Sequence, residues 1–232
     1  NVLFLGTGVD IDYELDGQPN VAASGDDSNL TDDEDGVQFP QTALVPGRTY
    51  AIPVVANAPG ILNAWIDYSQ GFVFGFPASE QIATNVALVA GTNTINVTIP
   101  MTFPVGSATT TYARFRFSSV AGLGETGLAP DGEVEDYSVV ISDLDFGDAP
   151  DNSAIATDFA TLLASNGARH IITVGGPVLG ANVDAELNGQ QNATATGDDT
   201  LDANDDEDGV TFTTPLIPGD TANASVVVSV AG

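Results

Sequence analysis

The sequence predicts an all-β chain built from antiparallel β-sandwich modules of the immunoglobulin or jelly-roll kind, arranged in tandem and interrupted by one short helix. Two observations support this fold class. Short runs of β-branched and aromatic residues alternate with turn-forming Gly, Pro, Asn and Asp. The 232 residues are also 43% hydrophobic and include 25 Gly and 13 Pro, which is enough to build a core and to reverse the chain often. We therefore expect a folded chain rather than an acidic disordered segment.

The expected strands are short and separated by turn residues. They cover residues 50–56, 61–68, 94–99, 112–117 and 137–141, and a run at 224–230 repeats the first of them. The one expected helix covers residues 158–164. It would end at Asn166-Gly167, because both residue types adopt the left-handed conformation that closes a helix.

A long internal repeat divides the chain. The block Asp32-Asp33-Glu34-Asp35-Gly36-Val37 returns as Asp205-Asp206-Glu207-Asp208-Gly209-Val210, and Leu5-Gly6 returns as Leu179-Gly180. The period of 172 to 174 residues is the size of a whole domain. The pattern therefore predicts separate modules that follow one another along the polypeptide.

Three parts follow from this period. Residues 1–142 would form a β-sandwich module that ends in the Gly-Glu-Val-Glu-Asp-Tyr strand. Residues 143–174 would form an Asp- and Pro-rich junction with the short helix, and residues 175–232 the first third of a second copy. We expect the chain to be a window from a longer polypeptide whose repeats continue in register. Strand exchange with another chain, in a head-to-tail polymer, is the alternative.

Charge limits the classes of partner. The chain has 32 Asp and Glu against four Arg, no Lys and no Cys, for a formal net charge of −28 at pH 7. Such a surface has no basic patch for nucleic acid and is repelled by anionic lipid. No stretch approaches 18 consecutive apolar residues, so we expect no membrane insertion. The expected electrostatic partners are divalent cations.

The acidic residues are clustered, which favours bound cations over a merely solvated surface. Ten lie in residues 10–35, ten in 125–158 and nine in 184–208. Like charges crowded in this way repel one another unless a counterion is present. In the first cluster the acids alternate with apolar residues, so an extended chain would place the carboxylates on one face, roughly 7 Å apart. Oxygen ligands at such spacing are typical of Ca²⁺ loops.

We therefore expect Ca²⁺ as a cofactor, with a solvated acidic loop as the alternative. The match to an EF-hand loop is poor, because no Glu stands at the twelfth position and no helices flank the segment. Ca²⁺ is also expected to stiffen a junction between modules around residues 143–153. The candidate ligands are Asp10, Asp12, Glu14, Asp16, Asp26, Asp27, Asp32, Asp33 and Asp35 in the first copy, and Asp184, Glu186, Asp198, Asp199, Asp205, Asp206 and Asp208 in the second.

A second group of charged residues predicts structural ion pairs. Glu133 and Glu135 share a strand face with Tyr137, which places them at the core side of the sandwich, where carboxylates need partners. Arg114 and Arg116 alternate with apolar residues on a neighbouring strand. We expect an Arg-carboxylate ladder that joins these arginines to Glu133, Glu135 or Asp136. A metal at this place is the alternative.

Catalysis is not expected. Without Cys or Lys, and with His170 as the only histidine, the chain cannot assemble a nucleophile with a base, and His170 is expected to be structural. A carboxylate pair could serve a glycosidase. However, such sites need an aromatic cleft for sugar, and the 17 aromatic residues lie mostly on predicted strand faces.

Four motifs stand out along the chain: Ala-Arg-Phe-Arg-Phe-Ser at 113–118, Ala-Pro-Asp-Gly-Glu-Val-Glu-Asp-Tyr at 129–137, Asp-Phe-Gly-Asp-Ala-Pro-Asp at 145–151 and Asn-Gly-Ala-Arg-His at 166–170. Together they resemble the GEVED-domain family of bacterial extracellular repeat proteins. The resemblance spans the chain. It implies large secreted or surface-anchored multidomain proteins that are often adhesin-like and have no known catalytic activity.

The resemblance also implies a metal loop of the form Trp-Ile-Asp-x-Asn-x-Asp-Gly-x-Phe followed by Glu. In this chain the corresponding stretch runs from Trp65 through Asp67 to Glu80, and Ser69 and Gly71 replace ligand-type residues. We therefore expect a hairpin turn here, with Trp65 in the core.

The expected function is that of a structural or adhesive repeat module of a large secreted or cell-surface bacterial protein, forming a Ca²⁺-stiffened stalk or extracellular fibre. Its expected partners are neighbouring copies of the same repeat, in the same polypeptide or head to tail. The alternative is a ligand-binding adhesin domain that recognises carbohydrate or a protein partner.

Overall fold

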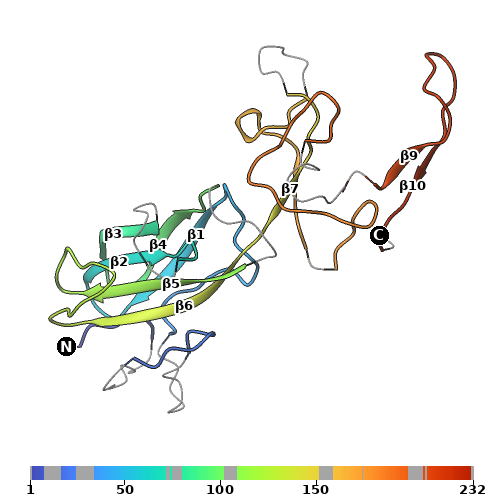
Figure 1. Cartoon of the computed structure of the whole chain (residues 1–232). Coiled ribbons are helices and arrows are strands. Elements are labelled where there is room, and N and C mark those ends of the chain that lie inside the picture. Colours follow the sequence, from blue (N-terminus) through green and yellow to red (C-terminus); the bar gives the residue numbers. More distant parts are fainter. Residues whose placement is uncertain are drawn as a thin grey trace. The chain divides into compact units, whose positions relative to one another are not determined.

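The computed structural model of the chain describes residues 2–7, 17–24, 34–71, 74, 80–101, 109–151, 159–173, 175–197, 206 and 208–230. It divides into two compact units (Figure 1). Unit 1 comprises residues 1–104 and 109–141, and unit 2 comprises residues 105–108 and 142–232. The described part is nearly all β, with antiparallel sheets in both units. No helix in it has the length and apolar character needed to cross a membrane.

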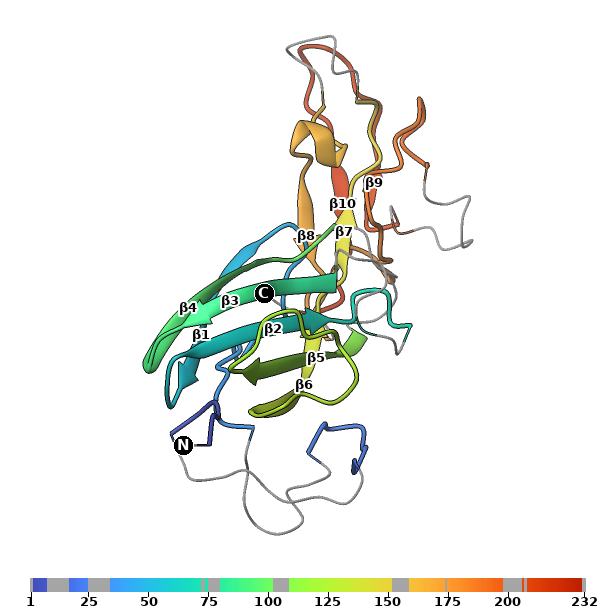
Figure 2. The same ribbon diagram turned by 90° about the vertical axis from the view of Figure 1, so that its left-hand side faces the viewer.

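Unit 1 contains two antiparallel sheets. Its strands are β1 (Thr49–Ala56), β2 (Gly60–Ile66), β3 (Gln81–Leu88), β4 (Gly91–Thr98), β5 (Thr109–Ser118) and β6 (Glu133–Ile141). Strands β3, β2, β5 and β6 lie side by side in that order, and β1 pairs with β4 to form the second sheet (Figure 2). Strands 50–56, 61–68, 94–99, 112–117 and 137–141 were expected, and each lies within or overlaps an observed strand.

Strand β3 was not expected from the sequence. Its burial does not alternate, because only two of its eight residues are buried and four in its middle are exposed. Asn85 has a φ of 50°, and the pairing of β2 with β3 shifts register on both sides of Ala64. Such a bulged edge strand lacks the period of two on which sequence reading depends.

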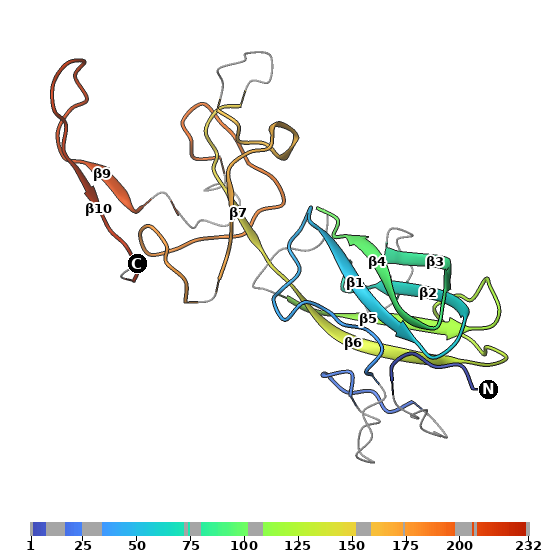
Figure 3. The ribbon, with the colours of Figure 1, turned by 180° about the vertical axis from the view of Figure 1, so that it is seen from behind.

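The two sheets of unit 1 share one hydrophobic core. Buried residues of β1 and β4 belong to one cluster with buried residues of β2, β5 and β6. Figure 3 shows the strands of unit 1 from behind. On β5, Ala113, Phe115 and Phe117 point inward and are at most 1% exposed. The alternation of β5 therefore leaves Arg114 and Arg116 on the opposite face of the same strand.

Two segments outside the strands complete this core. Leu5 pairs with Ala56, Val37 pairs with Val54, and Leu44 pairs with Ile141 through isolated bridges. The side chains of Leu5, Val37 and Leu44 are all buried. Segments 2–7 and 34–39 thus extend the first layer, formed by β1 and β4, through Leu5 and Val37, and the chain then reaches β6 of the other sheet at Leu44.

Unit 2 contains shorter elements. They are β7 (Leu144–Phe146), the 3₁₀ turn η3 (Leu163–Ser165), β8 (Arg169–Ile171), β9 (Val210–Phe212) and β10 (Ala224–Val226). The helix expected over 158–164 does not form in the described residues, which contain only η3. Asn166 closes η3 with a φ of 57°, in the left-handed conformation expected there. Three residues are too few for an α-helical turn, and Asp151 instead accepts N–H groups from Thr161 and Leu162.

Residues 143–173 fold together with the beginning of the second copy. Glu186 N–H donates to Leu144 O at 2.9 Å, and Asn192 N–H donates to Asp148 O at 3.1 Å. Asp151 N–H donates to Gln191 Oε1 at 2.5 Å. The segment expected to be a junction is therefore an integral part of unit 2.

The turn before β6 yields a prediction about Gly132. Its φ is +90°, and a Cβ placed on it would lie 1.8 Å from Phe117 O. Gly122 also has a positive φ, of +81°, but a Cβ there would meet nothing within 4 Å. Gly122→Ala should cost only the conformational penalty of about 1–2 kcal/mol, whereas Gly132→Ala should cost several kcal/mol more because the backbone of β5 must move. Urea denaturation of both variants measures the difference, and equal losses would show that the close approach is unimportant.

Candidate metal centre and the carboxylates of the repeat

In unit 1 the carboxylates of β6 bind backbone N–H groups. Glu135 Oε1 accepts the N–H of Gly36 at 3.0 Å, and Glu133 Oε1 accepts the N–H of Leu5. Both donors belong to the segments that complete the first layer. A Cβ on Gly36 would lie 2.9 Å from Glu135 Oε1, so only glycine allows the carboxylate to approach this closely. The two glutamates therefore attach the N-terminal segments to the sheet.

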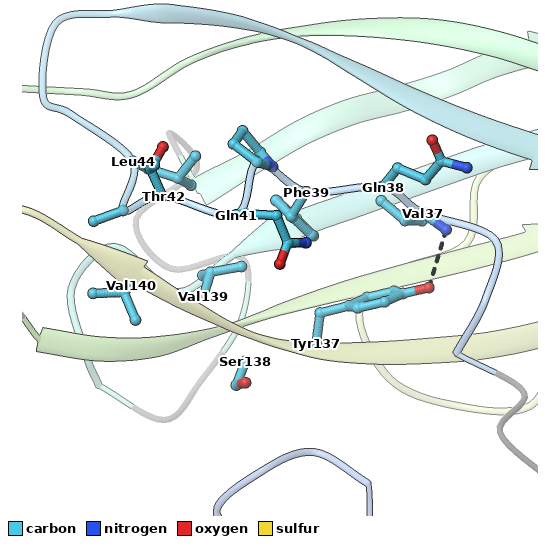
Figure 4. Close-up of a pocket in the computed structure, with 12 residues that line it drawn as sticks. Val37, Gln38, Phe39, Gln41, Thr42, Leu44, Tyr137, Ser138, Val139 and Val140 are labelled. Atoms are coloured by element: carbon cyan, nitrogen blue, oxygen red, sulfur yellow. Dashed lines mark hydrogen bonds between the residues drawn. The ribbon is translucent and has the colours of Figure 1, made fainter.

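Tyr137 extends this attachment. Its hydroxyl accepts the N–H of Val37 at 3.0 Å and donates to Glu135 Oε2 at 3.1 Å. Its ring lies 5.7 Å from that of Phe39 and 5.9 Å from that of Phe115. Figure 4 shows the hydroxyl directed at Val37, beside a groove of about 670 Å³ between residues 37–44 and 137–140.

Burial changes the protonation of this group. Glu135 is 1% exposed. Desolvation raises its pKa to about 8, and the charges of Glu133 and Asp35 act in the same direction, while the hydrogen bonds from Gly36 and Tyr137 oppose the shift. Burial and the neighbouring Glu135 likewise raise the pKa of Tyr137. Glu135 is therefore a carboxyl group held in the core by hydrogen bonds from Gly36 and Tyr137, and neither Arg114 nor Arg116 donates to it.

The expected Arg-carboxylate ladder is reduced to one pair. Arg114 forms a bidentate pair with Asp136, with Nε to Oδ1 at 2.7 Å and Nη2 to Oδ2 at 2.6 Å. These residues stand directly opposite each other on β5 and β6. Glu135 stands opposite Phe115 and faces the core. Because neighbouring positions on a strand point to opposite faces, the arginines cannot reach Glu133 or Glu135.

Arg116 serves a different purpose from the one expected. Its guanidinium donates to the carbonyl oxygens of Gly124, Thr126 and Gly127 at 2.6 to 2.8 Å. The residue is 4% exposed. Arg116 therefore holds the loop between β5 and β6, and no carboxylate partner is among its contacts in the described residues.

The Asp67 turn has the hydrogen bonding of a hairpin connection. Asp67 Oδ1 accepts Ser69 Oγ–H at 3.2 Å and Gly71 N–H at 3.1 Å, and Glu80 Oε1 accepts Ser69 N–H at 2.9 Å. Trp65 is 2% exposed and lies in the interior, as expected. Glu80 is fully buried, and its charge together with burial raises the pKa of Tyr68.

A group of three carboxylates in unit 2 has the arrangement of a metal centre. Asp145 on β7, Glu186 and Asp206 each direct an oxygen so that the three atoms lie within 4.8 Å of one another. Glu186 and Asp206 are among the expected ligands and lie 20 residues apart in the sequence. His170 lies at the margin, with Nδ1 4.0 Å from Asp145 Oδ2, and is mostly exposed.

Glu186 is the buried member of this group. It is 4% exposed. Its Oε2 accepts the N–H of Phe146 at 2.7 Å, but its buried Oε1 receives no N–H or O–H from any described residue. Burial raises its pKa, and so do the charge of Asp184, a side-chain hydrogen bond with Asp184 and the charge of Asp145, against the effect of the Phe146 hydrogen bond. A cation would stabilise a buried carboxylate that lies beside two further carboxylates.

The remaining expected ligands divide into two sets. Asp208 accepts the N–H of Ala181 at 3.0 Å, and Asp35 accepts the N–H of Thr7 at 3.4 Å, so both cap the turn after a Leu-Gly pair. Asp184 lies close enough to Glu186 to raise its pKa. Asp10, Asp12, Glu14, Asp16, Asp26, Asp27, Asp32, Asp33, Asp198, Asp199 and Asp205 lie outside the described residues.

Asp145 was not among the individual ligands expected from the sequence. The available signal was the Asp-rich composition of residues 143–153, which indicated Ca²⁺ at this junction without identifying a residue. The pairing of Glu186 N–H with Leu144 O brings β7 beside the second acidic cluster. A contact between segments 41 residues apart is not visible in local spacing.

The Glu135 pKa predicts how stability depends on pH. Between the ordinary value of 4.5 and about 8, the folded state retains a proton that the unfolded state releases. Its contribution to stability is therefore complete below pH 4.5 and is lost as pH rises through about 8. Glu135→Gln can still accept the Gly36 N–H but cannot titrate. From pH 5 to pH 8 the free energy of unfolding, measured by urea denaturation, should fall less for the variant than for the unmodified chain, by about a few kcal/mol. Equal falls in the two proteins would contradict the raised pKa of Glu135.

The two arginines should differ in their contribution to stability. Arg116→Leu leaves three carbonyl oxygens without their donor and should cost about 2–4 kcal/mol. Arg114→Leu leaves Asp136, whose side chain is 33% exposed and can be hydrated, and should cost about 1 kcal/mol. Thermal denaturation of the two variants provides the comparison. A larger loss for Arg114→Leu would overturn this order.

Comparison with protein families agrees with these motifs. Comparison with curated proteins and with solved structures gives no match. Residues 61–140, which run from β2 to the end of β6 and include the two glutamates and Tyr137, match the family model of the GEVED domain.

Proposed function

We propose that this chain is a Ca²⁺-stabilised structural module of an extracellular repeat protein. The observation that carries the proposal is Glu186, which has one oxygen within 4.8 Å of oxygens of Asp145 and Asp206, and whose buried Oε1 has no hydrogen-bond partner among the described residues. The internal repeat and the match to the GEVED domain support the wider assignment to a modular protein.

The donor set favours Ca²⁺ over other metals. All three groups are carboxylates, which are hard oxygen ligands, and the chain contains no thiolate. Ca²⁺ accepts six to eight oxygens in flexible geometry, so carboxylates can bind through one or two oxygens and carbonyls or waters can complete the shell. Mg²⁺ requires stricter octahedral geometry and holds its waters more firmly.

A cation at this place would connect three separate parts of unit 2. Asp145 belongs to β7, Glu186 follows the second Leu-Gly pair, and Asp206 precedes β9. Binding would offset the repulsion between the carboxylates and fix the two later segments against β7. A structural role of this kind needs no catalytic group.

The Gly-Glu-Val-Glu-Asp-Tyr motif also supports a structural rather than a catalytic role. Glu133, Glu135 and Tyr137 bind backbone N–H groups, and Asp136 pairs with Arg114. Each polar side chain of the motif thus has a partner that stabilises the sandwich. We extend this to the whole protein: repeated modules would form a stalk or fibre at the bacterial cell surface, with neighbouring copies as partners.

The calcium proposal is tested by denaturation and by binding stoichiometry. At a hundredfold excess over the dissociation constant, Ca²⁺ should stabilise the chain by about 2.7 kcal/mol. The effect should be large at pH 8 and small at pH 5, because protons compete for Glu186, whose pKa is raised. Thermal melts with EDTA, CaCl₂ or MgCl₂ measure this, and Mg²⁺ should rescue only part of the loss.

A matched pair of variants isolates the proposed centre. Asp206→Asn and Asp220→Asn remove the same charge, but Asp220 is exposed and lies outside the cluster. Calorimetric titration should find one Ca²⁺ fewer per chain in Asp206→Asn and no change in Asp220→Asn. Identical stoichiometry in both variants, or identical melts in EDTA and CaCl₂ for the unmodified chain, would exclude the centre.

A further inference from the structure

The second copy reproduces a local arrangement of the first. In unit 1, Gly6 N–H donates to Val55 O at 2.9 Å and Val55 N–H donates to Gly36 O at 2.8 Å. In unit 2, Gly180 N–H donates to Val227 O at 3.0 Å and Val227 N–H donates to Gly209 O at 2.8 Å. The Leu5–Ala56 bridge likewise corresponds to the Leu179–Val228 bridge. Residues 179–180 and 208–228 therefore have the same local backbone arrangement as the corresponding part of the first layer of unit 1.

Corresponding glycines in the two copies leave equally little space for a Cβ atom. A Cβ on Gly6 would lie 1.5 Å from Asp35 Oδ1, and a Cβ on Gly180 would lie 1.4 Å from Asp208 Oδ1. A Cβ on Gly209 would meet the backbone of Leu179 and Gly180, as one on Gly36 would meet Leu5 and Gly6. The correspondence thus extends from hydrogen bonds to atomic packing.

The two copies differ in what covers this layer. In unit 1, Leu5, Val37, Val54 and Ala56 are at most 6% exposed, because the sheet of β2, β5 and β6 packs on them. In unit 2, the equivalent Leu179, Val210, Val226 and Val228 are 43% to 57% exposed. Figures 1 and 3 show the β9–β10 hairpin without any described strand of its unit packed on it as a second layer.

We infer that the β9–β10 face of unit 2 is a docking surface for an uncovered GEVED-type sheet. Such a sheet has the strands of β2, β3, β5 and β6, and its outer strand carries two glutamates and a tyrosine at alternate positions. The glutamates accept the N–H groups of Leu179 and Gly209, and the tyrosine hydroxyl accepts that of Val210. The apolar side chains of the face fill the core between the two layers.

The backbone N–H groups of Leu179 and Gly209 favour a sheet with carboxylate acceptors over a purely apolar partner. No described residue accepts the N–H of Leu179 or Gly209, whereas Leu5 and Gly36 donate to Glu133 and Glu135 in unit 1. A lipid surface or an arbitrary apolar patch would bury these donors without acceptors, which is costly. Carboxylates spaced two residues apart on one strand face provide acceptors at the required positions. This inference depends on hydrogen bonds and exposure in the β9–β10 region and is independent of Ca²⁺ binding.

Hydrogen exchange of the unmodified chain tests whether the β9–β10 face is uncovered. Amides of residues 209–228 should exchange at least about 100-fold faster than those of residues 36–56, because the corresponding backbone lacks its second layer. Equal protection in the two segments would overturn the inference. Protection of residues 209–228 that increases with protein concentration would also overturn it, because the face would then bind a second copy of the chain as it stands.

An extended chain tests the occupant. Val228 corresponds to Ala56, so residues 1–228 followed directly by residues 57–141 supply β2 to β6 in the register of the first copy. Exchange at residues 209–228 should fall to within about tenfold of that at residues 36–56. The matched control carries Glu133→Leu and Glu135→Leu in the added segment only, and should lose most of this protection.

Two results would refute the docking surface. One is an added segment that forms protected sheet while residues 209–228 exchange as in the unmodified chain. The other is equal protection with and without the added glutamates, which would mean that apolar contact alone determines binding. If the extended chain fails to fold, the comparison of segments within the unmodified chain still decides whether the face is open.

Discussion

The sandwich of unit 1 depends on backbone N–H groups that are bound by carboxylates across its two layers. Glu133, Glu135 and Tyr137 receive N–H groups from residues 128, 99 and 100 positions away in the sequence. Without these acceptors, segments 2–7 and 34–44 would bury donors that no neighbouring strand satisfies. Ordinary ladder hydrogen bonds hold each sheet together, and the motif holds the sheets to the irregular segments that close the core. The hexapeptide at 132–137 therefore has a structural partner for each of its polar side chains.

The chain contains two buried glutamates whose surroundings differ in one respect. Glu135 has a donor for each oxygen, Gly36 and Tyr137. Among the described residues Glu186 has a donor for Oε2 only, and one of its oxygens lies within 4.8 Å of oxygens of Asp145 and Asp206. Both groups have raised pKa values because burial disfavours the charged form. A protein with a net charge of −28 can stabilise a buried carboxyl by N–H groups, as unit 1 does for Glu135, and we propose a cation for Glu186 in unit 2.

Local patterns in the sequence predicted five of the six strands of unit 1 and the faces of β5 and β6, because side chains alternate strictly along a strand, but not the short strands β7, β8 and β9 of unit 2. The same alternation, applied to the paired strands β5 and β6, would have assigned Arg114 to Asp136. They are the oppositely charged residues that stand directly opposite each other on the outer face. The role of Arg116 depends on the path of a loop, and the contribution of Asp145 depends on a pairing between distant segments. Neither leaves a periodic signal. Strand β3 was missed for a related reason, because a bulge at Asn85 interrupts its period.

The order of segments along the repeat explains how half a module can adopt its local fold without its second layer. Strands β9 and β10 are joined by 11 residues, so closing the hairpin costs less loop entropy than a contact across about a hundred residues. The contacts that bury its equivalent in unit 1 close loops of about a hundred residues and are expected to form late in folding. The Leu-Gly and Asp-Gly turns have the same backbone hydrogen bonds in both copies, including those of Gly6 with Val55 and of Gly180 with Val227. The exposed face therefore has the internal hydrogen bonds of the buried one, and only the acceptors on a covering sheet distinguish the two.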